Sequence, residues 1–294
     1  MKKVVVVCDV KFWAFYNLFR ALKKYLTSWQ IDDTYTTECS IVKHTNYDVI
    51  LFLCDYQVGL IRWNKIPKEK TILAIRSNVK LRFYENEDLN DVASIIAVAN
   101  SSLKDRFDKL HKNVVLAPGG VDLNIFKFQP KSLSSKLRIG WSGSRSNFGG
   151  GLRGLNLIIQ ACQETGHKFV PAFREDKWRT LEEMNDYYHN EIDIYVDMSF
   201  EAGRQNGLLE AAACGVPVIA SRAGFSEQLI KNNENGLLCD RNVESLKTCL
   251  NNVQEKHSDY VYKMFDVVKK KWSWEVQSIV FEKMFKQIID IKST

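Results

Sequence analysis

Three acidic residues in one short segment have the types and the spacing to bind a ligand rich in hydroxyl groups. Glu201, Glu210 and Glu227 lie within residues 201–240, whose sequence is EAGRQNGLLEAAACGVPVIASRAGFSEQLIKNNENGLLCD. A carboxylate can accept hydrogen bonds on both oxygens, which suits the neighbouring hydroxyls of a sugar or a ribose. The segment therefore predicts a binding site for a polyhydroxylated molecule.

The same segment predicts a short helix that could hold an anion. Asn206 and Gly207 are typical of a helix start, Glu210 of a first turn, and Gly215 of a helix end. The free N–H groups and partial positive charge at a helix start suit a diphosphate. Alanines at 211–213 keep the helix narrow, so we expect that a ligand could approach its backbone closely.

The composition is that of an ordinary globular protein with room for two hydrophobic cores. The chain has 294 residues, of which 45% are hydrophobic and 26% charged. No apolar run approaches the roughly 20 residues that span a bilayer, and Val4–Val7 is too short for a signal-peptide core. Seven scattered cysteines without a CxxC pair favour reduced thiols in a cytoplasm over a disulfide framework or a zinc site.

The net charge of +6 is confined to the first half of the chain. Residues 1–131 hold 20 Lys and Arg against 14 Asp and Glu, whereas residues 132–294 hold 21 of each kind. The first half could face an anionic acceptor or a membrane surface. A solvated basic face explains the same charges.

Strand-like and helix-like stretches alternate along both halves. Strands are predicted at 3–7, 47–53, 71–75, 93–98, 113–117, 137–141, 168–172, 193–198, 217–220 and 236–239. Helices are predicted at 12–26, 101–110, 152–165, 178–189, 208–214, 225–231, 243–255 and 260–291, the last broken near Trp272 and Trp274. This pattern predicts two Rossmann-like α/β domains with parallel sheets, facing across a ligand cleft. We expect a first domain at 1–131, a second at 132–272, and a final helix, about 273–294, that crosses back to the first.

Several motifs resemble the nucleotide-sugar signature of the retaining glycosyltransferases of family 4, which have the GT-B fold. The stretch NGLLEAAACGVPVIAS at 206–221 carries most of the resemblance, and AGFSE at 223–227 follows it. Pro118–Asp122 resembles the family's turn before the hinge, and Ile139–Gly143 with Arg153 resembles its phosphate loop. The resemblance covers residues 118–240, and over 1–117 it is architectural only.

The resemblance implies a role for each acid. Glu210 would bind the donor's ribose, Glu201 would act catalytically at the donor sugar, and Glu227 would lie near the nucleotide sugar. Eight residues separate Glu201 from Glu210 where the family has seven, so backbone amides of 202–206 could replace it. Each of two acids also has an explanation without a ligand. Glu210 could complement the helix dipole or belong to a capping box, and Glu227 could cap a helix together with Ser226.

The resemblance also implies a diphosphate site built from cations and backbone N–H groups. Its candidate residues are Gly143, Ser144, Arg145, Arg153, Asn206, Gly207, Leu208 and Leu209. Arg153 stands where the family has lysine, which keeps the charge and changes the geometry.

The first strand–helix loop departs from the family, because it lacks the glycine-rich turn of many members. Asp9 could instead bind an acceptor hydroxyl as a catalytic residue, and Trp13 could stack on a sugar, although core packing explains the aromatic residues equally well. No Asp-x-Asp motif is present and Asp32-Asp33 is isolated, so we expect metal independence.

These features predict a glycosyltransferase that moves a hexose from a nucleotide-diphospho-sugar to an acceptor hydroxyl with retention of configuration. We expect no cofactor, a UDP- or GDP-sugar donor, and a carbohydrate, glycan or glycolipid acceptor. Nucleic acid is not the expected partner, and the protein could lie at a membrane surface. A non-catalytic sugar-nucleotide-binding protein and a GT-B sugar-nucleotide epimerase are the alternatives.

Overall fold

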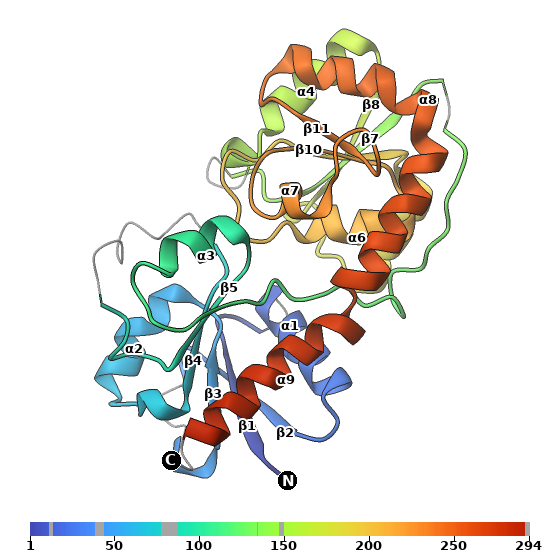
Figure 1. The fold of residues 1–294 in the computed structure, drawn as a ribbon. Helices are drawn as coiled ribbons and strands as arrows, with labels where there is room; N and C mark the ends of the chain where they lie inside the picture. Colours follow the sequence, from blue (N-terminus) through green and yellow to red (C-terminus); the bar gives the residue numbers. More distant parts are fainter. Residues whose placement is uncertain (12–13, 39–43, 78–87, 134, 147–149, 292–294) are drawn as a thin grey trace. The chain divides into compact units, whose positions relative to one another are not determined.

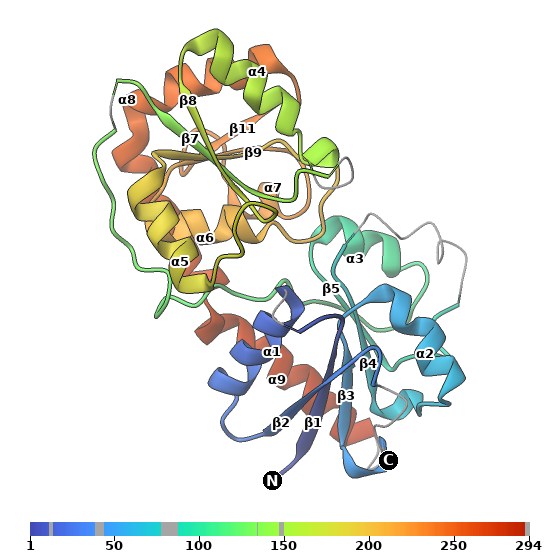
Figure 2. The ribbon, with the colours of Figure 1, turned by 180° about the vertical axis from the view of Figure 1, so that it is seen from behind.

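The chain folds as two compact units, each with a parallel sheet between layers of helices (Figures 1 and 2). The computed structural model describes residues 1–11, 14–38, 44–77, 88–133, 135–146 and 150–291. The first unit comprises Met1–Gly120 and Trp274–Thr294, and the second comprises Val121–Ser273. The predicted pair of Rossmann-like domains, with a final helix on the first, is therefore confirmed.

The first unit has the strand order β2–β1–β3–β4–β5–β6, with every neighbouring pair parallel. Its strands are β1 Lys3–Cys8, β2 Gln30–Tyr35, β3 Val49–Phe52, β4 Thr71–Ile75, β5 Ile95–Val98 and β6 Val114–Leu116. Its α-helices are α1 Ala14–Tyr25, α2 Val58–Trp63, α3 Ser101–Phe107 and α9 Trp274–Ile291, and its 3₁₀ turns are η2 His44–Asn46, η3 Asp55–Gln57 and η4 Lys68–Lys70.

Alternating side chains of β1 build a core on each face of this sheet. Val4 and Val6 pack in a cluster with α1 and α9, whereas Val5 and Val7 pack in a cluster with α2 and α3. Successive side chains of a strand point to opposite faces, so an all-apolar strand serves both layers. The run Val4–Val7 is therefore buried from both sides.

The sequence patterns did not predict β2 or α2. Strand β2 is an edge strand, in which Ile31 and Thr34 are buried while Gln30 and Asp33 are exposed. Its mixed composition carries no continuous apolar run. Helix α2 spans less than two turns, too short for a helical period to show.

The second unit has the order β11–β10–β9–β7–β8, also parallel throughout. Its strands are β7 Arg138–Gly143, β8 Lys168–Phe173, β9 Ile194–Asp197, β10 Val218–Ser221 and β11 Leu237–Cys239. Its helices are α4 Leu155–Thr165, α5 Leu181–Asp186, α6 Asn206–Cys214, α7 Ser226–Leu229 and α8 Val243–Val267, with π-helical turns η7 Tyr187–Glu191 and η8 Val268–Trp272. Helices α4 and α8 cover one face, and α5, α6 and α7 the other.

The chain passes from the second unit to the first within one residue. Trp272 belongs to the core of the second unit and Trp274 to the core of the first, while Ser273 between them is extended (φ −75°, ψ 155°). At the other crossing, Val121 and Phe126 pack in the second core, so the structure places 121–131 with the second unit. Over the described ranges, no helix combines the length and the apolar composition that crossing a bilayer requires.

Helix α9 should contribute strongly to the stability of the first unit. Phe285 is fully buried and meets the Trp29 ring edge-on, with ring centroids 5.4 Å apart. We expect Phe285→Ala to destabilise this unit by about 3–5 kcal/mol, because it leaves a cavity in the core. Urea unfolding followed by tryptophan fluorescence measures this, and Ile279→Ala, at a 49% exposed position of the same helix, is the matched control. Equal effects of the two substitutions would show that α9 is not packed on this sheet.

Candidate functional site

The centre of the candidate site is the start of α6, between β9 and β10 at the carboxyl edge of the second sheet. Gln205 is the N-cap, with φ −102° and ψ 76°, so the helix begins at Asn206. Glu210 therefore lies in the second turn, and the expectation of a first-turn acid is wrong. Gly215 ends the helix in the left-handed region, with φ +80°, as its position in the sequence predicts.

The small residues of α6 serve protein packing and do not open the helix to a ligand, contrary to our expectation. The alanines at 211–213 are buried in the core of the second unit. At Gly207, a Cβ would lie 2.2 Å from the Tyr195 hydroxyl and 2.5 Å from Ser142 Oγ. The close approach that Gly207 permits is thus made by two protein hydroxyls.

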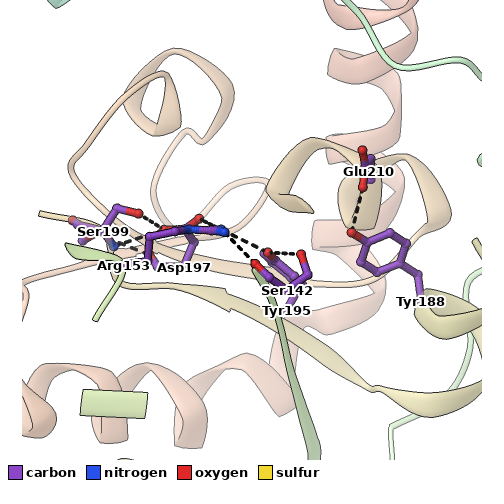
Figure 3. A network of polar contacts seen from close by, with 8 residues as sticks. Ser142, Arg153, Tyr188, Tyr195, Asp197, Ser199 and Glu210 are labelled. Carbon is purple, nitrogen blue, oxygen red and sulfur yellow. Dashed lines mark hydrogen bonds and ion pairs between the residues drawn. The ribbon is translucent and has the colours of Figure 1, made fainter. Parts of the chain in front are cut away.

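Glu210 is held by a buried tyrosine on a neighbouring element. Helix α5 begins with a capping box between Thr180 and Glu183 and leads into η7, which carries Tyr188. The Tyr188 hydroxyl donates to Glu210 Oε2 at 2.9 Å (Figure 3). Because the glutamate lies in the second turn and accepts this bond, neither helix-dipole compensation nor a capping box accounts for it.

Burial raises the pKa of the half-buried Glu210, while Tyr188, Arg204 and Arg153 act in the opposite direction. The same environment raises the pKa of Tyr188 well above its usual value, through burial and the neighbouring carboxylate. Tyr188 therefore stays a hydrogen-bond donor to Glu210. The second Glu210 oxygen retains acceptor capacity for a ligand.

Arg153 lies in a buried polar network that joins β7 to β9 (Figure 3). Its guanidinium donates to Asp197 Oδ2 at 2.8 Å, to the Ser142 carbonyl at 2.6 Å and to the Tyr195 hydroxyl at 3.4 Å. It also lies 5.0 Å from the centroid of the Trp141 ring. This arginine is fixed on several sides by the protein itself.

Asp197 neutralises Arg153, a partnership that sequence reasoning missed. Asp197 is 0% exposed, and it also accepts hydrogen bonds from the backbone and side chain of Ser199. Burial disfavours the charge of Arg153, but Asp197 and Tyr195 outweigh it and raise the pKa of Arg153 above its usual value. The expected phosphate-binding cation therefore already has a carboxylate partner.

The loop after β7 is likewise tied to acids. Ser144 Oγ donates to Glu175, and Arg145 forms an ion pair with Asp176 while its guanidinium lies 4.2 Å from the centre of the Phe173 ring. Gly143 lies against Arg153 and Trp141, since a Cβ there would be 2.7 Å from each. The glycine at 149 lies outside the described residues.

The structure does not bring the three acids of the segment into one cluster of buried carboxylates. Glu201 is exposed on the irregular bend that precedes α6. Glu227 is exposed in the first turn of α7, where it pairs with Arg222 at 3.0 Å. Phe225, and not Ser226, is the N-cap of α7, because the Ser226 hydroxyl donates to the Ser221 carbonyl instead.

Two consecutive polar side chains before α6, Arg204 and Gln205, were not among the candidates from the sequence, whereas Asn206 beside them was. Burial lowers the pKa of Arg204 to about 10, although the attraction of Glu210 opposes this shift. Gln205 is 2% exposed, and within the described ranges neither its amide nitrogen nor its amide oxygen has a hydrogen-bond partner. The side-chain oxygen Oδ1 of Asn206 likewise has no hydrogen-bond partner within the described ranges. The run Arg-Gln-Asn next to a helix start was the signal available.

The remaining candidates on α6 contribute backbone groups at most. Leu208 and Leu209 are fully buried, and the Leu209 N–H donates to the Gln205 carbonyl at 3.3 Å. The N–H groups of Asn206, Gly207 and Leu208 precede the first intrahelical bonds. These three groups are the ones a bound anion could use.

In the first unit, Asp9 follows β1 at the carboxyl edge of the sheet and is half-buried. Burial raises the pKa of Asp9, with backbone hydrogen bonds acting against it. Nearby, the buried Gln57 donates to Thr36 Oγ1 at 2.9 Å and accepts from the Cys54 N–H at 3.0 Å. Trp13 lies outside the described residues. Asp9 and Glu201 belong to different units.

Metal independence stays a prediction. Over the residues that the structure describes, no three His, Cys, Asp or Glu side chains gather as a metal site would need.

The second unit matches a family model. Residues 171–256, which include Tyr188, Asp197 and all of α6, match the model described as Glycosyl transferases group 1. Comparison with curated proteins gives no match.

The whole chain resembles solved structures of low sequence identity. Sucrose-phosphate synthase (tll1590) from Thermosynechococcus elongatus superposes with a TM-score of 0.76 at 13% identity, covering 99% of this chain and 100% of that one. Anabaena Alr3699/HepE, in complex with UDP and glucose, gives 0.75 at 13%, covering 98% and 100%. The catalytic domain of starch synthase IV from Arabidopsis thaliana, bound to ADP and acarbose, gives 0.71 at 10%, covering 99% of each. These matches confirm the predicted GT-B fold class.

Breaking the Arg153–Asp197 pair should destabilise the second unit. Asp197→Asn leaves a buried guanidinium without its counter-charge, which costs about 3–5 kcal/mol. Replacing both residues with leucine should cost less than Asp197→Asn alone, because no unpaired charge remains. Urea unfolding measures both.

The matched control is Asp266→Asn, which removes an exposed ion pair with Lys270 on the same unit and should leave the midpoint unchanged. A shift for Asp197→Asn as small as that of the control would contradict the structural role.

Proposed function

We propose that this protein is a glycosyltransferase that moves a sugar from a nucleotide-diphospho-sugar to an acceptor hydroxyl. The observation that carries the proposal is Glu210, half-buried and oriented by Tyr188 one turn inside α6, with Arg204 before the helix start. The match of residues 171–256 to Glycosyl transferases group 1, and the solved structures that hold UDP, glucose or ADP, support the same class of ligand.

In the proposed donor complex, each part of the ligand meets a group of suitable chemistry. Glu210 accepts hydrogen bonds from the ribose hydroxyls. The diphosphate lies at the start of α6, where the N–H groups of Asn206, Gly207 and Leu208 and the Arg204 guanidinium supply positive charge. The donor is a UDP- or GDP-sugar with a hexose.

Arg153 acts in this proposal as a positioning residue. It donates to the Ser142 carbonyl and to the Tyr195 hydroxyl, and the Ser142 and Tyr195 hydroxyls are hydrogen-bonded to each other at 2.9 Å. These bonds hold the two hydroxyls that lie against Gly207 and so position the N-terminus of α6. Arg145 and Ser144 border the diphosphate from the loop after β7. Glu227, in the first turn of α7, would lie near the nucleotide sugar.

Catalysis would depend on stabilising charge and on positioning. A leaving nucleoside diphosphate needs fixed donors and cations, which the start of α6 provides without a metal ion. Glu201 would act at the donor sugar and Asp9 at the acceptor hydroxyl, with retention of configuration. Since burial raises its pKa, Asp9 would be a better proton acceptor than an ordinary aspartate.

The two domains would divide the substrates. The second unit, residues 121–273, would bind the donor, and the first, residues 1–120 with helix α9, would bind a carbohydrate, glycan or glycolipid acceptor. The basic first half would favour an anionic acceptor or peripheral contact with a cytoplasmic membrane surface.

Removal of Glu210 should weaken nucleotide binding. We expect Glu210→Ala to reduce the affinity for the nucleotide that the wild type prefers by roughly ten- to a hundredfold, because hydrogen bonds to a charged group are lost. Calorimetric titration with UDP, GDP and ADP measures this.

Glu255→Ala, at an exposed position of α8, is the matched control and should bind like the wild type. Binding that survives Glu210→Ala would remove the basis of the site. A second assay measures whether nucleoside diphosphate is released from UDP-, GDP- or ADP-glucose when carbohydrate acceptors are added. Release distinguishes a transferase from a protein that only binds the nucleotide sugar.

Donor affinity should also depend on pH through Glu210. Because burial raises the pKa of Glu210, its carboxylate is protonated at a higher pH than an ordinary glutamate. We expect affinity for a nucleotide-glucose to fall as the pH is lowered through that pKa, by up to about tenfold per pH unit for one proton. A nucleotide sugar is the right probe because its diphosphate does not titrate in this range. Glu210→Gln should flatten the profile, and a profile unchanged by this substitution would contradict the assignment.

A further inference from the structure

Gln205 is a buried residue of the second unit whose side-chain amide makes no hydrogen bond within the described residues. The residue is 2% exposed and is the N-cap of α6, yet it makes no side-chain capping bond. Over the described part of the chain, neither its amide oxygen nor its amide nitrogen has a partner. A buried amide without partners lowers the stability of a fold, so its presence needs a separate reason.

The amide lies between the two loops that follow β9 and β10. A Cβ on Gly224 would lie 2.8 Å from Gln205 Oε1 and 3.0 Å from the Ala202 Cβ. Gly224 has φ +58°, a conformation that glycine adopts readily. Both loops leave the carboxyl edge of the sheet, where ligands of parallel α/β folds bind.

The order of groups along a nucleotide sugar matches the order of residues along α6. Side chains of a helix tilt toward its N-terminus, so Glu210 reaches back over the first turn. Gln205 precedes Glu210 by five residues, about 7.5 Å along a helix axis. With the ribose at Glu210 and the diphosphate at the helix start, the transferred sugar follows on the side of Gln205.

We propose that the Gln205 carboxamide, assisted by Asn206, binds hydroxyl groups of the transferred sugar and selects among donor sugars. The inference rests on the proposed function and adds a sugar-selecting residue to it. An amide offers one acceptor oxygen and two donor hydrogens, which match a pair of neighbouring hydroxyls.

The test is Gln205→Met, which keeps the length of the side chain and removes its polar atoms. Binding of UDP, UDP-glucose and UDP-galactose, of GDP and GDP-glucose, and of ADP and ADP-glucose, is measured by calorimetry. We expect the affinity for the nucleotide alone to stay within about twofold. The extra affinity that the sugar contributes should fall by about five- to tenfold, and the preference between the glucose and galactose donors should shrink.

The unfolding temperature gives a second readout that separates a binding role from a structural one. Because no internal hydrogen bond is lost, Gln205→Met should be as stable as the wild type or more stable. Gln163→Met, at an exposed position of α4, is the matched control and should change neither readout.

The outcomes separate this inference from the proposed function. If the wild type binds none of these nucleotides or nucleotide sugars, the proposed function fails. If it binds them, but Gln205→Met keeps the full contribution of the sugar and the full preference between sugars, only the role of Gln205 is overturned. A loss of affinity that is equal for nucleotide and nucleotide sugar, with lower stability, also overturns it, because Gln205 would then support the fold.

Discussion

The geometry of the candidate site depends on the buried ion pair between Arg153 and Asp197. A fully buried carboxylate is tolerated only when it is paired and hydrogen-bonded, and Arg153 meets this need at 2.8 Å. The same guanidinium holds the Ser142 carbonyl and the Tyr195 hydroxyl, and these two residues lie against Gly207. Any side chain at Gly207 would meet these hydroxyls, so glycine is required there. The ion pair thus fixes two strand ends, and the strand ends fix the start of α6.

Much of the fold could be predicted because its strands are uniformly apolar and alternate with helices. The run Val4–Val7 and the strand at 218–221 are buried on both faces, so their composition alone identifies them. The predicted break near Trp272 and Trp274 is present, and each tryptophan enters a different core. Strand β2 could not be found in this way. It is an edge strand that buries only Ile31 and Thr34, so its sequence contains no apolar run. The turn of α6 that carries Glu210 was misplaced for a different reason, because capping residues in a sequence locate a helix start only to within one or two residues.

The site was only partly predictable, since its key partners are distant in sequence. Spacing pointed to Glu210, but Tyr188 lies 22 residues earlier and reaches it from another element. Arg153 was expected to meet a phosphate, yet its partner Asp197 lies 44 residues further along the chain. Similarly, Arg145 and Ser144 meet acids about 30 residues away, at the end of the neighbouring strand β8. A local motif specifies which residue types stand at a strand end or helix start. It does not specify which carboxylates of adjacent strands neutralise them.

The charged residues around α6 differ in how burial and neighbouring charges act on them. Arg153 and Arg145 each have a carboxylate partner in the protein, at Asp197 and Asp176. For Arg204 and Glu210, burial lowers the pKa of the arginine to about 10 and raises that of the glutamate, despite their mutual attraction. Each therefore pays a desolvation cost that the other does not offset. A diphosphate beside Arg204 would favour its charged form, and hydroxyls donating to Glu210 would favour the carboxylate. A nucleotide sugar carries both kinds of group in one molecule, so both shifts are consistent with the proposed donor.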